Sequence, residues 1–264
     1  MEDEAGGPAA MPQRSEIFED CAQESEEEEH APVPCNLRIL CYAKPKLVHD
    51  ALSSLSPIAT EVVKELGLEG MLSVQRILLM DRQFSLWLLS RLNPDTMSLR
   101  LGNGSVISLD EESVELVLGI RGHGAEVPRE TKKFNSYVEP AVARVLRLPD
   151  GTRHITAGDL SDVIARDLPE NPTEEDKDML RAAVLLFCCT HLLGPRDRIA
   201  VIPKDVLQCA MYPRTLQYYN WAKYTIETLR DSAEKLKDDL AHEHKTLLIG
   251  GCLLYLQVCV PYIF

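Results

Sequence analysis

The stretch EEDKDMLRAAVLLFCCTHLLG, residues 174–194, decides the fold class of this chain. It opens with charged side chains and is then apolar on nearly every side over residues 180–193. A helix without a polar face belongs in the middle of a core, where other elements surround it. Thr173 and Asp176 have the spacing of a capping box at its start, and a Gly-Pro pair ends it. The stretch therefore predicts a domain built around one buried helix.

Much of the remaining sequence also predicts helices, because capping residues precede apolar segments of helical period. Ser108 and Glu111 have the spacing of a further capping box, and Pro203 is expected at the first position of another helix. The segment 98–108 instead predicts a hairpin that turns at Gly-Asn-Gly. We expect a mainly α fold with small β hairpins, as a single multi-helix domain over residues 37–264.

The longest periodic segment lies between residues 215 and 240. Its apolar residues step alternately by four and three, which gives a heptad seam over 222–240. A seam of this length suits two structures. It can pair with a second copy as a coiled-coil homodimer, or it can pack on a neighbouring element of the same chain.

Residues 1–36 form an acidic leader. Eleven of the first thirty residues are acidic and one is basic, which accounts for −10 of the formal net charge of −13. Few large apolar side chains occur there, so we expect the leader to be disordered, as a solvating tail or a docking tail for a basic partner. Nothing in it resembles a secretory signal, and the eight cysteines are therefore expected to be reduced thiols in the cytosol or nucleus.

The best local candidate for nucleophilic chemistry is the pair Cys188 and His191, three residues apart on one helix. A catalytic thiol needs a lowered pKa and an imidazole partner. Because this helix is apolar on all sides, the pair is better interpreted as core, where a thiol is inert.

Other chemical signatures are missing from the sequence. The spacing of Cys21, Cys35, Cys41 and His49 does not fit a structural zinc site, and no Walker loop or dinucleotide fingerprint is present. We therefore expect no metal, no cofactor and no enzymatic activity.

A basic segment between residues 127 and 153 offers a different function. Its cations, together with Phe134 and Tyr137, are typical of a strip that contacts the phosphates of a nucleic acid. A solvated surface of mixed charge is the alternative interpretation. The candidate nucleic-acid contacts are Arg129, Lys132, Lys133, Arg144 and Arg147.

Four segments in their order carry a family resemblance: residues 78–120, with an NPDT corner and an LGI end, then 179–210, 219–229 and 250–258. Together they resemble the plant mobile domain family, transposon-derived domains also labelled aminotransferase-like. The resemblance implies a non-catalytic interaction module in the nucleus, with the cytoplasm as the second choice and unknown protein partners. In grasses such domains often precede a SUMO-type cysteine protease, so an inactive fragment of such a protein is an alternative.

The stretch KTLLIGGCLLYLQVCVPYIF, residues 245–264, has one strongly polar residue after its start, Gln257. A membrane-spanning helix usually needs about 20 apolar residues, and this stretch is shorter and contains glycines and a proline. A tail anchor is one interpretation. The resemblance implies instead a core helix of a domain shortened at its C-terminus. We expect it to be interior, packed against residues 180–193, without a membrane partner.

Overall fold

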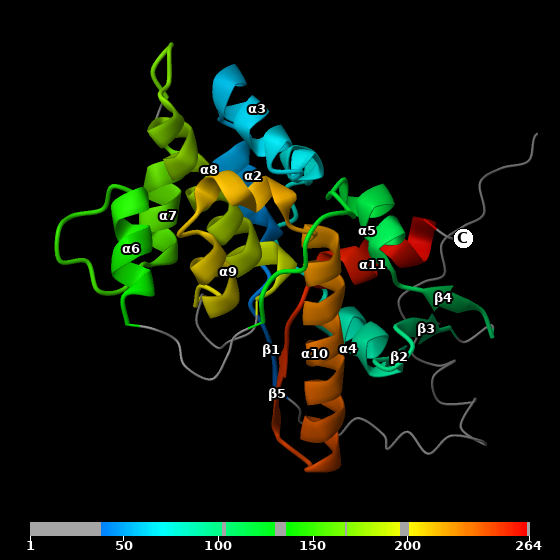
Figure 1. Ribbon diagram of the computed structural model, residues 1–264. Helices are drawn as coiled ribbons and strands as arrows, with labels where there is room; N and C mark the ends of the chain where they lie inside the picture. The colour runs from blue at the N-terminus through cyan, green and yellow to red at the C-terminus, as the bar shows by residue number, and fades with distance from the viewer. Residues whose placement is uncertain (1–37, 102–103, 130–135, 167, 196–200, 263–264) are drawn as a thin grey trace, which may run out of the picture.

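The computed structural model describes residues 38–101, 104–129, 136–166, 168–195 and 201–262. The acidic leader expected over residues 1–36 lies outside these ranges. The described chain is mainly helical, with two small sheets, as the sequence predicts (Figure 1).

The bounds of the elements define the labels used below. The strands are β1 (Arg38–Cys41), β2 (Leu92–Asn93), β3 (Ser98–Arg100), β4 (Val106–Ser108) and β5 (Thr246–Ile249). The α-helices are α2 (Pro45–Leu52), α3 (Pro57–Glu65), α4 (Arg82–Arg91), α5 (Glu111–Leu118), α6 (Val138–Val145), α7 (Ala157–Ile164), α8 (Glu174–Cys188), α9 (Lys204–Cys209), α10 (Trp221–Ala241) and α11 (Leu253–Tyr262). Two 3-10 helices, η1 (Glu69–Ser73) and η3 (Pro213–Tyr218), and one π-helical turn, η2 (Cys189–Leu193), complete the described elements.

Helix α8 is the centre of the core, which confirms the prediction from its apolar sequence. Every residue from Met179 to Leu193 is buried, and α3, α6, α7 and η3 pack around it. Its start is the expected capping box, in which the Asp176 amide donates to Thr173 Oγ1 over 3.2 Å.

A parallel pair of strands joins the two ends of the domain. Strand β1 pairs with β5 in the register Arg38↔Thr246 to Cys41↔Ile249. In Figure 1 this pair runs beside the long helix α10, between the α6–α9 group and the group of α4, α5 and α11. No sequence signal predicts this pairing, because the two strands are short and lie far apart in the chain.

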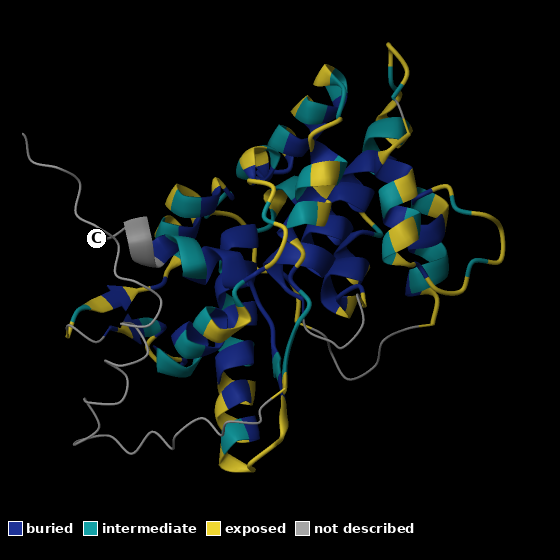
Figure 2. Ribbon diagram, turned by 180° about the vertical axis from the view of Figure 1, so that it is seen from behind, coloured by how far each residue is buried: buried dark blue, intermediate teal, exposed yellow. Residues whose placement is uncertain are grey.

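Helix α10 uses its heptad seam inside the chain. Ala222, Leu229, Ala233 and Leu236 are buried, and the helix packs against α4, α5 and β5. Its exposed residues all lie in its C-terminal part, from Glu234 onward (Figure 2). The seam is therefore occupied by neighbours of the same chain, which is the second of the two structures that its pattern allows, and it is not free to build the homodimer through 222–240.

The C-terminal helix α11 is interior, as predicted, but its neighbours differ from the prediction. Leu253 and Leu256 are fully buried, and the helix packs against α4 and α5 rather than against α8. Polar contacts select this position: Tyr255 Oη lies 2.5 Å from Ser113 Oγ on α5, and Gln257 Nε2 donates to Ser85 Oγ on α4 over 2.7 Å. None of the helices in the described ranges has the length and hydropathy of a membrane span.

Two predicted helix starts are wrong, one by two residues and the other by one. Ser108 does not cap α5, because its backbone is extended and pairs with Ser98 in the hairpin. Asp110 caps this helix instead, through a capping box with Ser113. Pro203 precedes α9 as its N-cap rather than taking the first helical position. The pairing of the two hairpin arms is confirmed, and β2 extends it to a three-stranded sheet; residues 102 and 103 of the predicted turn lie outside the described residues.

Candidate functional site

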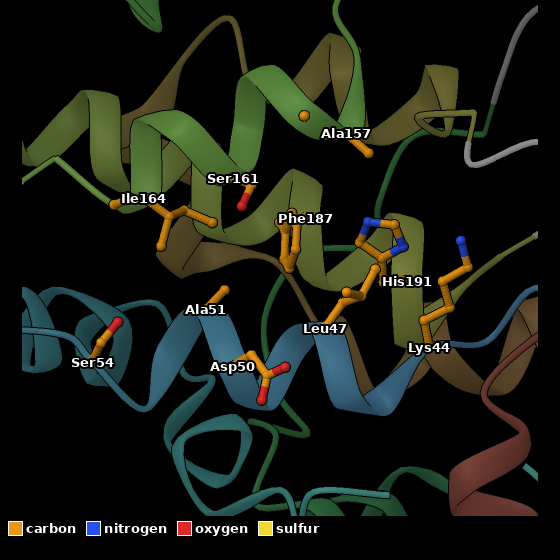
Figure 3. Close-up of a pocket in the computed structure, with 12 residues that line it drawn as sticks. Lys44, Leu47, Asp50, Ala51, Ser54, Ala157, Ser161, Ile164, Phe187 and His191 are labelled. Carbon is orange, nitrogen blue, oxygen red and sulfur yellow. The ribbon is translucent and has the colours of Figure 1, made fainter. Parts of the chain in front are cut away.

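A cleft of about 430 Å³ lies between α2 and α7, above the C-terminal part of α8. Its walls are largely apolar and include Leu47, Ile164 and Phe187, as the close-up in Figure 3 shows. Five polar side chains also line it: Lys44, Asp50, Ser54, Ser161 and His191. A concave, mainly apolar site with a few polar groups is the usual form of a ligand pocket, and its volume lies within the range of about 300–1,000 Å³ typical of such pockets.

His191 is the unusual residue of this cleft. Its side chain is almost fully buried, yet neither ring nitrogen has a hydrogen-bond partner among the described residues. The ring makes an edge contact with Phe187, with 4.6 Å between the ring centroids. Burial, and secondly the charge of Lys44, lower the pKa of His191 to about 4. The imidazole is therefore neutral at physiological pH and has one donor and one acceptor without a protein partner.

A local change in the helix places His191 at the cleft. Helix α8 passes into the π-helical turn η2, in which the Gly194 amide donates to the Cys189 carbonyl oxygen over 3.1 Å. The backbone of α2 meets this turn directly, since the Lys44 amide donates to the His191 carbonyl oxygen over 2.7 Å. Short π-helical turns occur frequently at functional sites.

The N-terminus of α7 forms one end of the cleft. Thr156 caps the helix and its Oγ1 accepts the Asp159 amide over 3.2 Å. The next residues, Ala157 and Gly158, line the cleft. The first amides of an α-helix have no acceptor within the helix and carry its positive partial charge. This end of the cleft is therefore suited to a group that accepts hydrogen bonds.

The thiol that the sequence pairs with His191 is not part of the cleft. Cys188 is fully buried, and burial raises its pKa to about 12. Cys252 has a pKa of about 12 for the same reason. The interpretation of this segment as core is therefore confirmed. Within the described ranges, no three His, Cys, Asp or Glu side chains gather in an arrangement that could hold a metal ion.

Two of the three described residues that were predicted to contact nucleic acid pair with acidic side chains. Arg129 is bound to α10 through Glu227 and Asp231, at 3.2 and 2.6 Å. Arg147 pairs with Asp176 of α8 at 2.7 Å, and Arg144 is exposed on α6. Lys132 and Lys133 lie outside the described residues. Two of these cations are thus occupied by acidic partners, and nucleic-acid binding stays a prediction.

An apolar groove of about 460 Å³ forms a second hollow, between η1, α5 and α11. Its floor depends on a close approach of two backbones, since the Gly70 amide donates to the Gly119 carbonyl oxygen over 3.0 Å and neither position has room for a side chain. Ile77, Val117 and Leu254 are among its lining residues.

Exposed leucines are adjacent in the sequence to lining residues of this groove. Leu78 and Leu79 directly follow Ile77 and are 66% and 82% exposed, and Leu116, which precedes Val117, is 85% exposed. The sequence gives a weak signal for this surface, because the apolar run at residues 77–80 does not follow a clear helix or strand period. Exposed apolar side chains that gather around a groove mark an interaction surface.

Comparison with known proteins finds one family. The family model described as a domain of unknown function, DUF8566, matches residues 41–257, which include every described helix from α2 to α10. No curated protein and no solved structure matches the chain.

Proposed function

The chain belongs to the DUF8566 family, and we propose that it is a non-catalytic nuclear interaction module of transposable-element origin. The observation that carries this proposal is the apolar groove between η1, α5 and α11 with its three exposed leucines, Leu78, Leu79 and Leu116. A partner that covers these side chains removes them from water, which favours binding by about 25 cal/mol for each Å² of apolar surface.

The chemistry of the described residues supports a binding role. Cys188 and Cys252 are thiols rather than thiolates at physiological pH, because burial raises the pKa of each to about 12. His191 has no acid, base or nucleophile bonded to its ring. A catalytic nucleophile needs an activating base within hydrogen-bond reach, and neither buried thiol shows one.

The partner that fits the groove is an amphipathic helix of another protein. Such a helix buries an apolar face in a groove through side chains spaced three and four residues apart. Glu69, Glu112 and Glu115 are exposed on the two elements that border the groove, η1 and α5. Their negative charge favours a partner helix with basic residues beside its apolar face, which would speed association and fix its orientation.

The resemblance to plant mobile domains supports the origin and the nuclear location. The segments that carry it correspond to α4 through α5, α8 with η2 and α9, the start of α10, and the first part of α11. These segments supply a large share of the buried core. They are signatures of a fold. A domain with this fold and without catalytic residues of its own implies an interaction role.

Site-specific photocrosslinking in plant nuclei tests this proposal. A photoreactive phenylalanine analogue replaces Leu116, and the same analogue at Val106, which is 60% exposed on β4, is the matched control. We expect a discrete crosslinked protein from position 116 that disappears when Leu79→Glu is added and persists with Val106→Glu. Equal labelling from both positions, or labelling that Leu79→Glu leaves unchanged, would exclude the groove as the binding surface.

A further inference from the structure

We propose that the cleft between α2 and α7 is a binding site for a small ligand with an anionic group, a carboxylate or a phosphate, on an apolar body. This site is separate from the apolar groove and does not depend on the function proposed for it. Three kinds of hydrogen-bond donor border one end of the cleft: the His191 ring, the first amides of α7 and the Lys44 ammonium. Figure 3 shows Ala157, His191 and Lys44 together at this end.

The His191 ring supplies the first observation. A buried polar group without a hydrogen bond is costly, and native proteins satisfy nearly all such groups. The ring is only 2% exposed and both its nitrogens lack a protein partner, yet it borders an open cleft of about 430 Å³. Both ring nitrogens are themselves buried, so a bound oxygen acceptor would receive the ring N–H once the ring turns toward the cleft. The unmet hydrogen-bonding capacity at the wall of the cleft is what a ligand atom would satisfy.

The α7 terminus and Lys44 supply the charge. The amides of Ala157 and Gly158 lie at the positive end of the α7 dipole, where anions bind favourably. Lys44, the residue before α2, is exposed at the cleft and has no ion pair among the described residues, in contrast to Lys46 on α2, which pairs with Asp50 at 2.7 Å. An anion between Lys44 and α7 would therefore meet positive charge from both sides.

Asp50 is the one acid among the lining residues, and its charge is already compensated. Its carboxylate pairs with Lys46 at 2.7 Å and with Arg76 at 3.0 Å. In Figure 3 it lies on α2 beyond Leu47, away from the end where Ala157 and His191 meet. The charge of Asp50 is thus compensated by two cations, and the other acid near the donors, Asp159 in the first turn of α7, accepts the Thr156 amide and hydroxyl at 2.8 and 2.7 Å.

The rest of the cleft determines what the anionic group is attached to. Leu47, Ala51, Ile164 and Phe187 present carbon along its length, and Phe187 contacts the His191 ring directly. An aromatic or short aliphatic body would bury its surface against these side chains. Phenyl phosphate and benzoate represent the two forms of this ligand, which differ only in the anionic group.

The test is an NMR titration of the full chain with ¹³C,¹⁵N-labelled histidine. The His191 ring signal is assigned through His191→Phe, and phenyl phosphate, benzoate, inorganic phosphate and benzyl alcohol are added separately. We expect a saturable shift with phenyl phosphate or benzoate, and binding at least tenfold weaker with benzyl alcohol. Tighter binding of phenyl phosphate identifies a phosphate ligand, and tighter binding of benzoate identifies a carboxylate.

Variants locate the binding. Lys44→Gln is expected to weaken it about tenfold, as the loss of a charge-assisted hydrogen bond does. The Ser161 side chain points from α7 into the cleft, so Ser161→Phe is expected to abolish ligand binding. Lys64→Gln, on α3 outside the cleft, is the matched control and should leave affinity unchanged. No saturable shift, equal binding of benzyl alcohol, or equal weakening by Lys64→Gln would overturn the proposal.

Discussion

Substitution of Leu256 by alanine tests whether α11 completes the core. Leu256 is fully buried, and α11 packs against α4 and α5. The substitution removes three carbon atoms, worth about 0.8 kcal/mol each in transfer from water, and leaves a cavity that costs about 24 cal/mol per Å³ where the surroundings do not relax. We therefore expect the free energy of unfolding to fall by about 3–4 kcal/mol.

Urea denaturation of the full chain measures this loss. With a dependence of about 2 kcal/mol per molar urea, the midpoint should move down by about 1.5–2 M. Far-ultraviolet circular dichroism and the fluorescence of the buried Trp221 should report the same transition. Leu116→Ala is the matched control, because its side chain is 85% exposed and its removal should change stability by less than about 0.5 kcal/mol.

The comparison between the two leucines decides the result. If Leu256→Ala costs less than about 1 kcal/mol, or no more than Leu116→Ala, then α11 is not a structural part of the core. Leu256→Met provides a second test in case Leu256→Ala does not fold. A volume-conserving exchange should lower the free energy of unfolding by less than about 1.5 kcal/mol. A full loss with alanine and a small loss with methionine would agree with burial against α4 and α5.

Three further predictions follow from single residues. Gly70→Ala should destabilise the chain by about 1–3 kcal/mol in urea denaturation, because its Cβ would lie 1.7 Å from the Leu118 carbonyl oxygen, whereas Gly158→Ala has room and should not. The pKa of His191 is about 4 in the folded chain and about 6.5 in the unfolded chain, so the unfolded state takes up a proton first as the pH falls. The free energy of unfolding should therefore decrease by about 2 kcal/mol between pH 7 and pH 5, and His191→Leu should remove this part of the decrease. Iodoacetamide should leave Cys188 and Cys252 unmodified in the native chain at pH 8 and label both in urea, as mass spectrometry of the peptides would show; rapid native labelling would contradict their burial.

The sequence predicts well what depends on neighbouring residues. The predicted cap at Thr173 is confirmed, because its side chain bonds the amide of Asp176 three residues ahead. Ser56, Asp81 and Thr156 cap their helices through equally local bonds, to an amide two or three residues ahead. The failure at Ser108 has the same local origin. Ser108 and Asp110 are both potential N-caps. Ser108 is part of the hairpin strand β4, so Asp110 caps the helix.

Contacts between segments that are far apart in the chain could not be predicted from the sequence. The partner of α11 is an example, since its apolar composition suits any core neighbour and gives no preference between α8 and α5. The choice depends on two polar contacts, Tyr255 with Ser113 and Gln257 with Ser85, which become visible only when the elements are in place. The pairing of β1 with β5 is a second example, because four-residue strands carry almost no periodic signal.

The candidate cleft shows the same division between local and distant information. The apolar context of residues 180–193 predicts that His191 is buried, and this is confirmed. Its border with a cleft depends on α2 and α7, which lie before it in the chain and whose sequences carry ordinary amphipathic patterns. A sequence pattern can thus predict that a histidine is buried, but it cannot predict whether the ring nitrogens have hydrogen-bond partners.

His191 is costly for stability, and this cost is itself an argument for function. An unpaired buried polar group costs about 1–3 kcal/mol, and an apolar side chain of similar size at this position would avoid it. The neighbouring core residues Phe187, Leu192 and Leu193 show that the site tolerates large apolar side chains. Residues that violate the rules of a stable core without local compensation concentrate at functional sites. Since His191 borders a cleft with a helix N-terminus and Lys44 at the same end, the compensation that the fold lacks is the one that a bound anion would provide.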